Sequence, residues 1–185
     1  MFLPRPGDRP GPAPIRFGRD WYAPVGGVLI FLCGGFALVA FPLDDVWHRI
    51  FGQDVTLWGP THLMLLGGAG MTLIGQAVLL TEARWTQRHV PAGDGASEAD
   101  RLGGRLVKAR QIGIAGGLLI GVSVYQGEFD FGVPQFRMVF EPAMLALAAG
   151  FALTAARLWT GRGGALVALL FFTVVRGAVS LSSAP

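Results

Sequence analysis

Five long runs of apolar residues constrain this sequence more than any other feature. Charged residues are almost absent from them, and they lie near residues 22–43, 62–81, 111–126, 138–156 and 164–181. Each run is close to the roughly 20 residues that a helix needs to cross the hydrocarbon core of a bilayer. The sequence therefore predicts an all-α integral membrane protein, a bundle of about five transmembrane helices.

The composition supports this prediction. Of the 185 residues, 52% are apolar and 15% are charged, whereas about 25% of the residues in a soluble domain are charged. Five such helices use most of the chain, so we expect a single transmembrane domain at residues 21–185, preceded by an arm at residues 1–20. We expect the helices at residues 21–43, 60–82, 111–126, 136–159 and 164–181.

Basic residues are distributed unevenly along the chain. They gather in the arm at residues 1–20, in the loop at residues 83–109 and near the turn at residues 160–164. Cytoplasmic loops are enriched in Lys and Arg, so we expect a multi-pass protein of the cell membrane with a cytoplasmic N-terminus. The arm is rich in proline and arginine, a composition that buries too little apolar surface to order itself, and we expect it to be flexible.

The formal net charge of +3 would suggest nucleic acid in a soluble protein, but the membrane topology accounts for it here. We therefore expect the lipid bilayer as a partner and no nucleic acid. Glycines of the first apolar run, such as Gly26 and Gly34, are small enough to let another helix approach closely. A homo-oligomer, other membrane subunits, or a longer chain that completes the bundle stay open as alternatives.

The segment between the first two predicted helices carries the residues best suited to chemistry. Asp44 and His48 are four residues apart and share one face if the first helix continues past Leu43. Asp45 is a substitute for Asp44. His62 falls in the first turn of the next helix, on the same side of the membrane, so a carboxylate and two imidazoles can converge. Such a set suits a divalent transition metal, because imidazole binds copper, zinc, iron and nickel.

A structural interpretation of the same residues is also open. Interfacial aspartates and histidines often cap helices, and either Asp44 or Asp45 could pair with Arg49. Further acids on the same side of the membrane are secondary candidates for the metal site, namely Glu128, Asp130 and Glu141. Glu141 lies just inside a predicted transmembrane helix, where an ionisable group is costly and suggests a function, although a first-turn acid also stabilises the helix dipole.

The same segment resembles a known metal site. Its residues are Asp44, Trp47 and His48, then Asp54, then Pro60, Thr61 and His62. This pattern resembles the metal-site segment of the C subunit of particulate methane and ammonia monooxygenases. By position, the resemblance implies that Asp44, His48 and His62 are metal ligands and that the metal is copper, with iron and zinc as alternatives. It also implies oxidation of an apolar small molecule admitted by the lipid-facing bundle, with no catalytic residue identified.

Three functions remain open from the sequence. The first is a membrane metalloprotein, a copper-dependent, monooxygenase-like oxidoreductase subunit. The second is a cation or proton transporter or channel-like subunit whose acidic residues form a pathway through the membrane. The third is a structural subunit of a larger membrane complex, in which the glycines pack against another chain.

Overall fold

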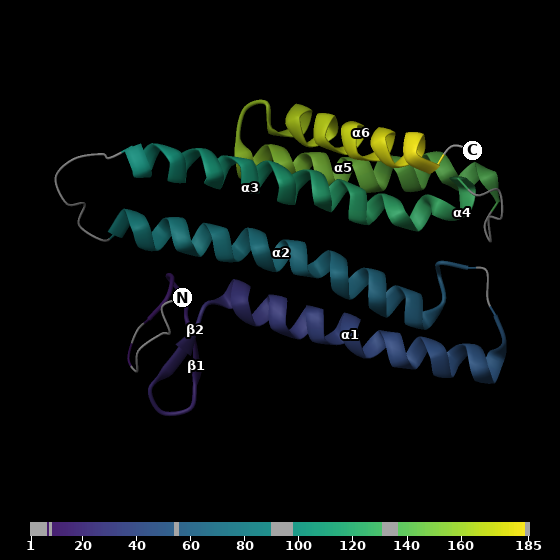
Figure 1. The fold of residues 1–185 in the computed structure, drawn as a ribbon, viewed down its shortest axis with the longest axis horizontal. Helices are drawn as coiled ribbons and strands as arrows, with labels where there is room; N and C mark the ends of the chain where they lie inside the picture. Colours follow the sequence, from purple (N-terminus) through teal and green to yellow (C-terminus); the bar gives the residue numbers. More distant parts are fainter. Residues whose placement is uncertain (1–6, 8, 54–55, 90–97, 131–136, 184–185) are drawn as a thin grey trace.

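The computed structural model of the chain is helical along most of its length (Figure 1). It describes residues 7, 9–53, 56–89, 98–130 and 137–183. In chain order the elements are β1 (Ile15–Phe17), β2 (Trp21–Ala23), α1 (Val25–Phe51), α2 (Pro60–His89), α3 (Glu98–Ser123), η1 (Val124–Gln126), α4 (Gly127–Asp130), η2 (Met138–Phe140), α5 (Glu141–Thr160) and α6 (Gly164–Ser183).

Four helical segments in the described part of the chain are long and apolar enough to cross a membrane. They are Val25–Phe51, Pro60–Thr86, Gly103–Phe129 and Met138–Thr160. The apolar part of α6, Gly164–Val179, is shorter. The helical architecture predicted from the sequence is confirmed, and these helices fit a multi-pass membrane protein. A fifth span and the cytoplasmic N-terminus stay predictions.

The first helix differs from its expected bounds of 21–43 at both ends. Trp21–Ala23 instead pairs with Ile15–Phe17 as an antiparallel hairpin, so part of the arm expected to be flexible has regular structure. Pro24 follows with an extended backbone, and α1 begins after it, because proline has a fixed φ and no N–H and so suits the start of a helix. The helix then continues to Phe51, which places the aspartate and first histidine of the predicted metal site on α1.

A side chain from α2 caps the N-terminus of α1. Glu82 is 7% exposed, and its carboxylate accepts hydrogen bonds from the backbone N–H groups of Val25 (2.9 Å) and Gly26 (3.0 Å). These first N–H groups have no partner within the helix and form the positive end of its dipole. The cap fastens the two helices at the end opposite His62, about 30 Å away along α2 at 1.5 Å per residue.

Glycines bring α1 and α2 into very close contact. A Cβ on Gly26 would lie 2.3 Å from the backbone nitrogen of Leu79, and a Cβ on Gly68 would lie 2.8 Å from the carbonyl oxygen of Cys33. Both distances are shorter than atoms tolerate, so no larger residue fits without movement. The close approach expected at Gly26 is confirmed, whereas a Cβ on Gly34 would lie 3.7 Å from Thr72 Cγ2, an ordinary contact. Helices α1 and α2 therefore form a tight antiparallel pair.

The side of α1 that faces α2 has a regular spacing. Its residues recur every three or four positions, as expected for one face of a helix, and comprise Gly26, Ile30, Cys33, Ala37, Ala40, Asp44 and His48. The first five are small or apolar, whereas the last two are polar. The helix face that packs against α2 thus ends in an aspartate and a histidine.

The remaining long helices form a second group beside this pair (Figure 1). Helices α3, α5 and α6 pack on one another around the buried residues Ala115, Ala156 and Ala168, and α2 packs against α3. At one end of the bundle, Trp159 Nε1 of α5 donates a hydrogen bond to Thr81 Oγ1 of α2 (3.1 Å). The two groups of helices therefore meet along α2.

Replacing Gly68 by alanine is expected to destabilise the α1–α2 pair, because the new Cβ would lie 2.8 Å from the Cys33 oxygen and 2.9 Å from the Ala37 nitrogen. Overpacking of this kind costs about 1–3 kcal/mol. Gly70→Ala is the matched control, since its Cβ would meet no heavy atom within 4 Å. Thermal unfolding of the detergent-solubilised protein should give a lower Tm for G68A than for G70A. Equal values would contradict the close packing.

Candidate metal centre

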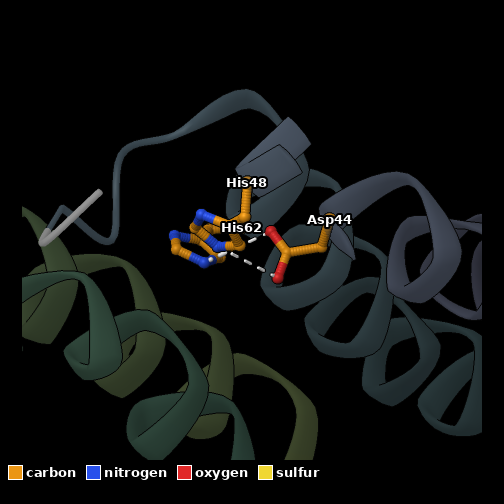
Figure 2. A group of neighbouring side chains, drawn as sticks. All are labelled: Asp44, His48 and His62. Atoms are coloured by element: carbon orange, nitrogen blue, oxygen red, sulfur yellow. Dashed lines mark ion pairs between the residues drawn. The ribbon is translucent and has the colours of Figure 1, made fainter. Parts of the chain in front are cut away.

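Asp44, His48 and His62 lie together where α1 meets α2 (Figure 2). Asp44 and His48 are one turn apart on α1, and His62 belongs to the first turn of α2. One ligand atom from each residue lies within 4.8 Å of the other two. The structure thus brings together the three residues that the sequence predicts as ligands, in a group that could hold a metal ion.

The two imidazoles face one carboxylate from different helices. Asp44 Oδ2 lies 3.5 Å from His48 Nε2, and Asp44 Oδ1 lies 3.4 Å from His62 Nε2. Both separations are longer than the roughly 2.7–2.9 Å of a charge-assisted hydrogen bond. For metal–ligand distances of about 2.0–2.1 Å, the edge of a coordination tetrahedron is about 3.3–3.4 Å. Each imidazole faces a different oxygen of Asp44, and these two separations are close to that edge length, so a shared metal ion is compatible with them.

The Nδ1 atoms of both histidines face backbone carbonyls. His48 Nδ1 lies 3.1 Å from the Gly52 oxygen, and His62 Nδ1 lies 2.7 Å from the Thr56 oxygen. A carbonyl oxygen only accepts hydrogen bonds, so Nδ1 carries the proton, and in the neutral ring the lone pair is on Nε2. An ionised Asp44 also only accepts. Both Nε2 atoms and the Asp44 carboxylate thus converge in an arrangement that a metal ion could bridge.

The hydroxyl of Thr61 orients the carboxylate of Asp44. Thr61 is 5% exposed, and its Oγ1 donates a hydrogen bond to Asp44 Oδ1 at 2.6 Å. The side chains of the three clustered residues are partly exposed, at 26% for Asp44, 17% for His48 and 24% for His62. The carboxylate is therefore held by a buried hydroxyl, while the side chains of all three residues stay partly accessible.

The structure separates Asp45 from Asp44. Asp45 Oδ2 lies 2.7 Å from a guanidinium nitrogen of Arg49, and the two side chains are 61% and 75% exposed. This exposed pair lies away from the three clustered residues, so the sequence alternative in which an aspartate pairs with Arg49 is realised by Asp45. The residues of α1 that face α2 recur every three or four positions, and this series contains position 44 but not position 45. The same series can be read from the sequence.

The other secondary candidates are outside the three-residue group. Glu128 is buried and accepts hydrogen bonds from the loop that precedes α2. Glu141 is half-buried in the first turn of α5. The side chain of Asp130 and all of Asp54 lie outside the described residues. Thr61, which binds Asp44, was not among the predicted site residues, although it is adjacent to His62 in the sequence.

A pocket of about 190 Å³ lies between α2, α3 and α5. Its lining is almost wholly apolar and includes Leu73, Ile114, Leu118 and Phe151. Of the α2 residues that line the pocket, Leu73 lies nearest in the chain to His62. The two residues are about 16 Å apart along the helix axis. The pocket could take an apolar molecule, but it does not extend to the three clustered residues.

Comparisons of this chain with protein-family models, with curated proteins and with solved structures find no match. The residues and their geometry therefore carry the functional argument.

The two neighbouring aspartates provide a direct check of the site. Asp44→Asn is expected to weaken metal binding by at least about 10-fold, the lower limit for loss of a group that merely supports a ligand. Asp45→Asn should leave the affinity unchanged, because that carboxylate is exposed and paired with Arg49. Titration of each purified variant with Cu²⁺ measures the difference. Equal affinities for the two variants would rule out this arrangement of ligands.

Proposed function

We propose that this protein is a membrane metalloprotein that binds copper through Asp44, His48 and His62. The observation that carries the proposal is the convergence of both Nε2 atoms on one carboxylate, with both Nδ1 atoms facing carbonyls. Imidazole and carboxylate together suit divalent transition metals, and copper has the highest affinity for such ligands in the divalent first-row series. Zinc and iron are the alternatives that the same residues accept.

The protein would hold three donor atoms, from two helices, at fixed distances from one another. Asp44 and His48 are fixed by α1, and His62 by α2, so a bound ion also fastens the two helices to each other. Three protein ligands leave at least one position for water or a substrate, as in catalytic metal sites. When bound, copper would supply Lewis acidity and one-electron redox chemistry.

We further propose an oxidative, monooxygenase-like activity on an apolar small molecule. This part rests on the resemblance of the Asp44–His62 segment to the C subunit of particulate methane and ammonia monooxygenases. The apolar pocket between α2, α3 and α5 could take an apolar molecule within the bundle, but it does not reach the metal site, so it adds no support for oxidation there. We also propose that the N-terminus is cytoplasmic and the metal site near the outer face of the cell membrane, because the basic residues gather at the opposite ends of the helices.

The transport alternative has less support from the described side chains. A cation pathway needs acidic groups that face a common route. Asp45 instead pairs with Arg49 on an exposed surface, and Glu128 accepts hydrogen bonds from the loop at Thr56. These acids are engaged in separate contacts.

Metal analysis of the detergent-purified protein tests the proposal. Wild-type protein loaded with Cu²⁺ and then freed of excess metal should hold close to one ion per chain. His48→Ala and His62→Ala should each lose most of it, because each removes one of the three donors. His89→Ala is the control, since His89 is the last residue of α2, at the end opposite His62.

Two results would contradict the proposal. One is a wild-type protein that retains no metal after loading. The other is equal metal content in His48→Ala, His62→Ala and His89→Ala, which would show that any bound ion lies elsewhere.

A further inference from the structure

Glu128 of α4 is the largest side chain that is fully buried in the described part of the chain, with 2% of its surface exposed. It is not one of the three clustered residues. Its Oε1 accepts a hydrogen bond from the Thr56 hydroxyl and another from the Leu57 backbone N–H, the latter at 2.6 Å. A carboxylate buried away from water forms strong hydrogen bonds of this kind. Glu128 therefore fixes the loop that leads into α2.

Thr56 connects this carboxylate to the metal group. Its hydroxyl donates to Glu128 and accepts a hydrogen bond from the Trp58 N–H (3.0 Å). Its carbonyl oxygen faces His62 Nδ1 at 2.7 Å. A continuous series of hydrogen bonds thus runs from Glu128 through Thr56 to the imidazole whose Nε2 faces Asp44.

A ring contact reinforces the same connection. The indole of Trp58 lies against the phenol ring of Tyr125 in η1, with ring centroids 5.3 Å apart. Tyr125 and Glu128 both follow α3, so two residues after that helix contact residues 56–58, which precede α2. The loop is fastened to the second group of helices rather than to its own helices alone.

His48 has a different kind of support. Its Nδ1 faces the carbonyl of Gly52, four residues further along at the end of the same helix. This contact lies within α1 and its C-terminal cap. The two histidines should therefore respond differently to a change at Glu128.

We propose that Glu128 is a positioning residue for the metal site, which acts through Thr56 to fix the tautomer and the ring orientation of His62. This proposal rests on the proposed metal-binding function. Groups that orient a ligating histidine contribute about 10–100-fold to metal affinity. Because coupling between two sites is reciprocal, a bound metal should in turn stabilise the contact between Glu128 and the loop.

The chain offers a matched control in Glu82. Its carboxylate is also buried and accepts two hydrogen bonds, from the backbone N–H groups of Val25 and Gly26. It lies at the opposite end of α2, about 30 Å from His62 along the helix. Both alanine variants lose a buried carboxylate with two hydrogen-bonded donors, but only Glu128 connects to the metal group.

The experiment measures Cu²⁺ affinity and the electron paramagnetic resonance spectrum of the full chain in detergent. Glu128→Ala should weaken Cu²⁺ binding by about 10–100-fold and alter the spectrum, because His62 loses its orientation. Glu128→Gln keeps an oxygen acceptor and should restore most of the affinity. Glu82→Ala should lower the Tm but leave the affinity and spectrum as in the wild type. Equal losses in Glu128→Ala and Glu82→Ala would overturn the proposal.

Nitrogen NMR of the metal-free protein tests the role of Glu128 without any bound metal, so its outcome does not depend on whether the protein binds copper. In the wild type, the tautomer with the proton on Nδ1 should dominate for both His48 and His62. In Glu128→Ala, His62 should become a mixture of tautomers while His48 stays unchanged. An unchanged His62 would overturn the role of Glu128 even if the metal binds, whereas a wild type that binds no Cu²⁺ would contradict the metal function.

Discussion

Close packing between α1 and α2 is the constraint on which the site depends. Lipid tails are as apolar as the side chains, so two membrane helices associate through van der Waals contact and hydrogen bonds. Gly26 and Gly68 bring the backbones together, and the Glu82 carboxylate caps α1 at one end. The same helix face that carries the small residues ends in Asp44 and His48, so the packing that joins the helices also directs these two side chains toward α2.

The arrangement at the other end follows from hydrogen-bond chemistry. Each imidazole has its Nδ1 against a carbonyl oxygen, and each Nε2 faces Asp44. Thr61 fixes the carboxylate from one side. The three side chains are thus held near one another by groups that are themselves fixed, in an arrangement that could hold a metal ion. His62 Nδ1 contacts Thr56, and Thr56 donates a hydrogen bond to Glu128. The position of His62 therefore depends on contacts with residues that follow α3 as well as on α1 and α2.

Part of this could be predicted from the sequence. The apolar runs and the four-residue spacing of Asp44 and His48 predicted the helices and the pairing of these two residues, because both depend on local periodicity. His62 could be added because consecutive transmembrane helices have adjoining ends on the same side of the membrane. The hairpin of Ile15–Phe17 and Trp21–Ala23 was not predicted, since composition does not reveal backbone pairing. Glu128 was recognised as an acid on the same side, but its contact with the loop depends on how the end of α3 packs beside α2, which no local spacing encodes.

X-ray absorption spectroscopy of the copper-loaded protein tests the central claim most directly, because it reports the atoms bound to the metal. The account predicts imidazole scattering from two histidines and a first shell of nitrogen and oxygen, at distances near the roughly 2.0–2.1 Å typical of metal–imidazole bonds. A spectrum dominated by sulfur, or one without imidazole scattering, would contradict a site formed by Asp44, His48 and His62.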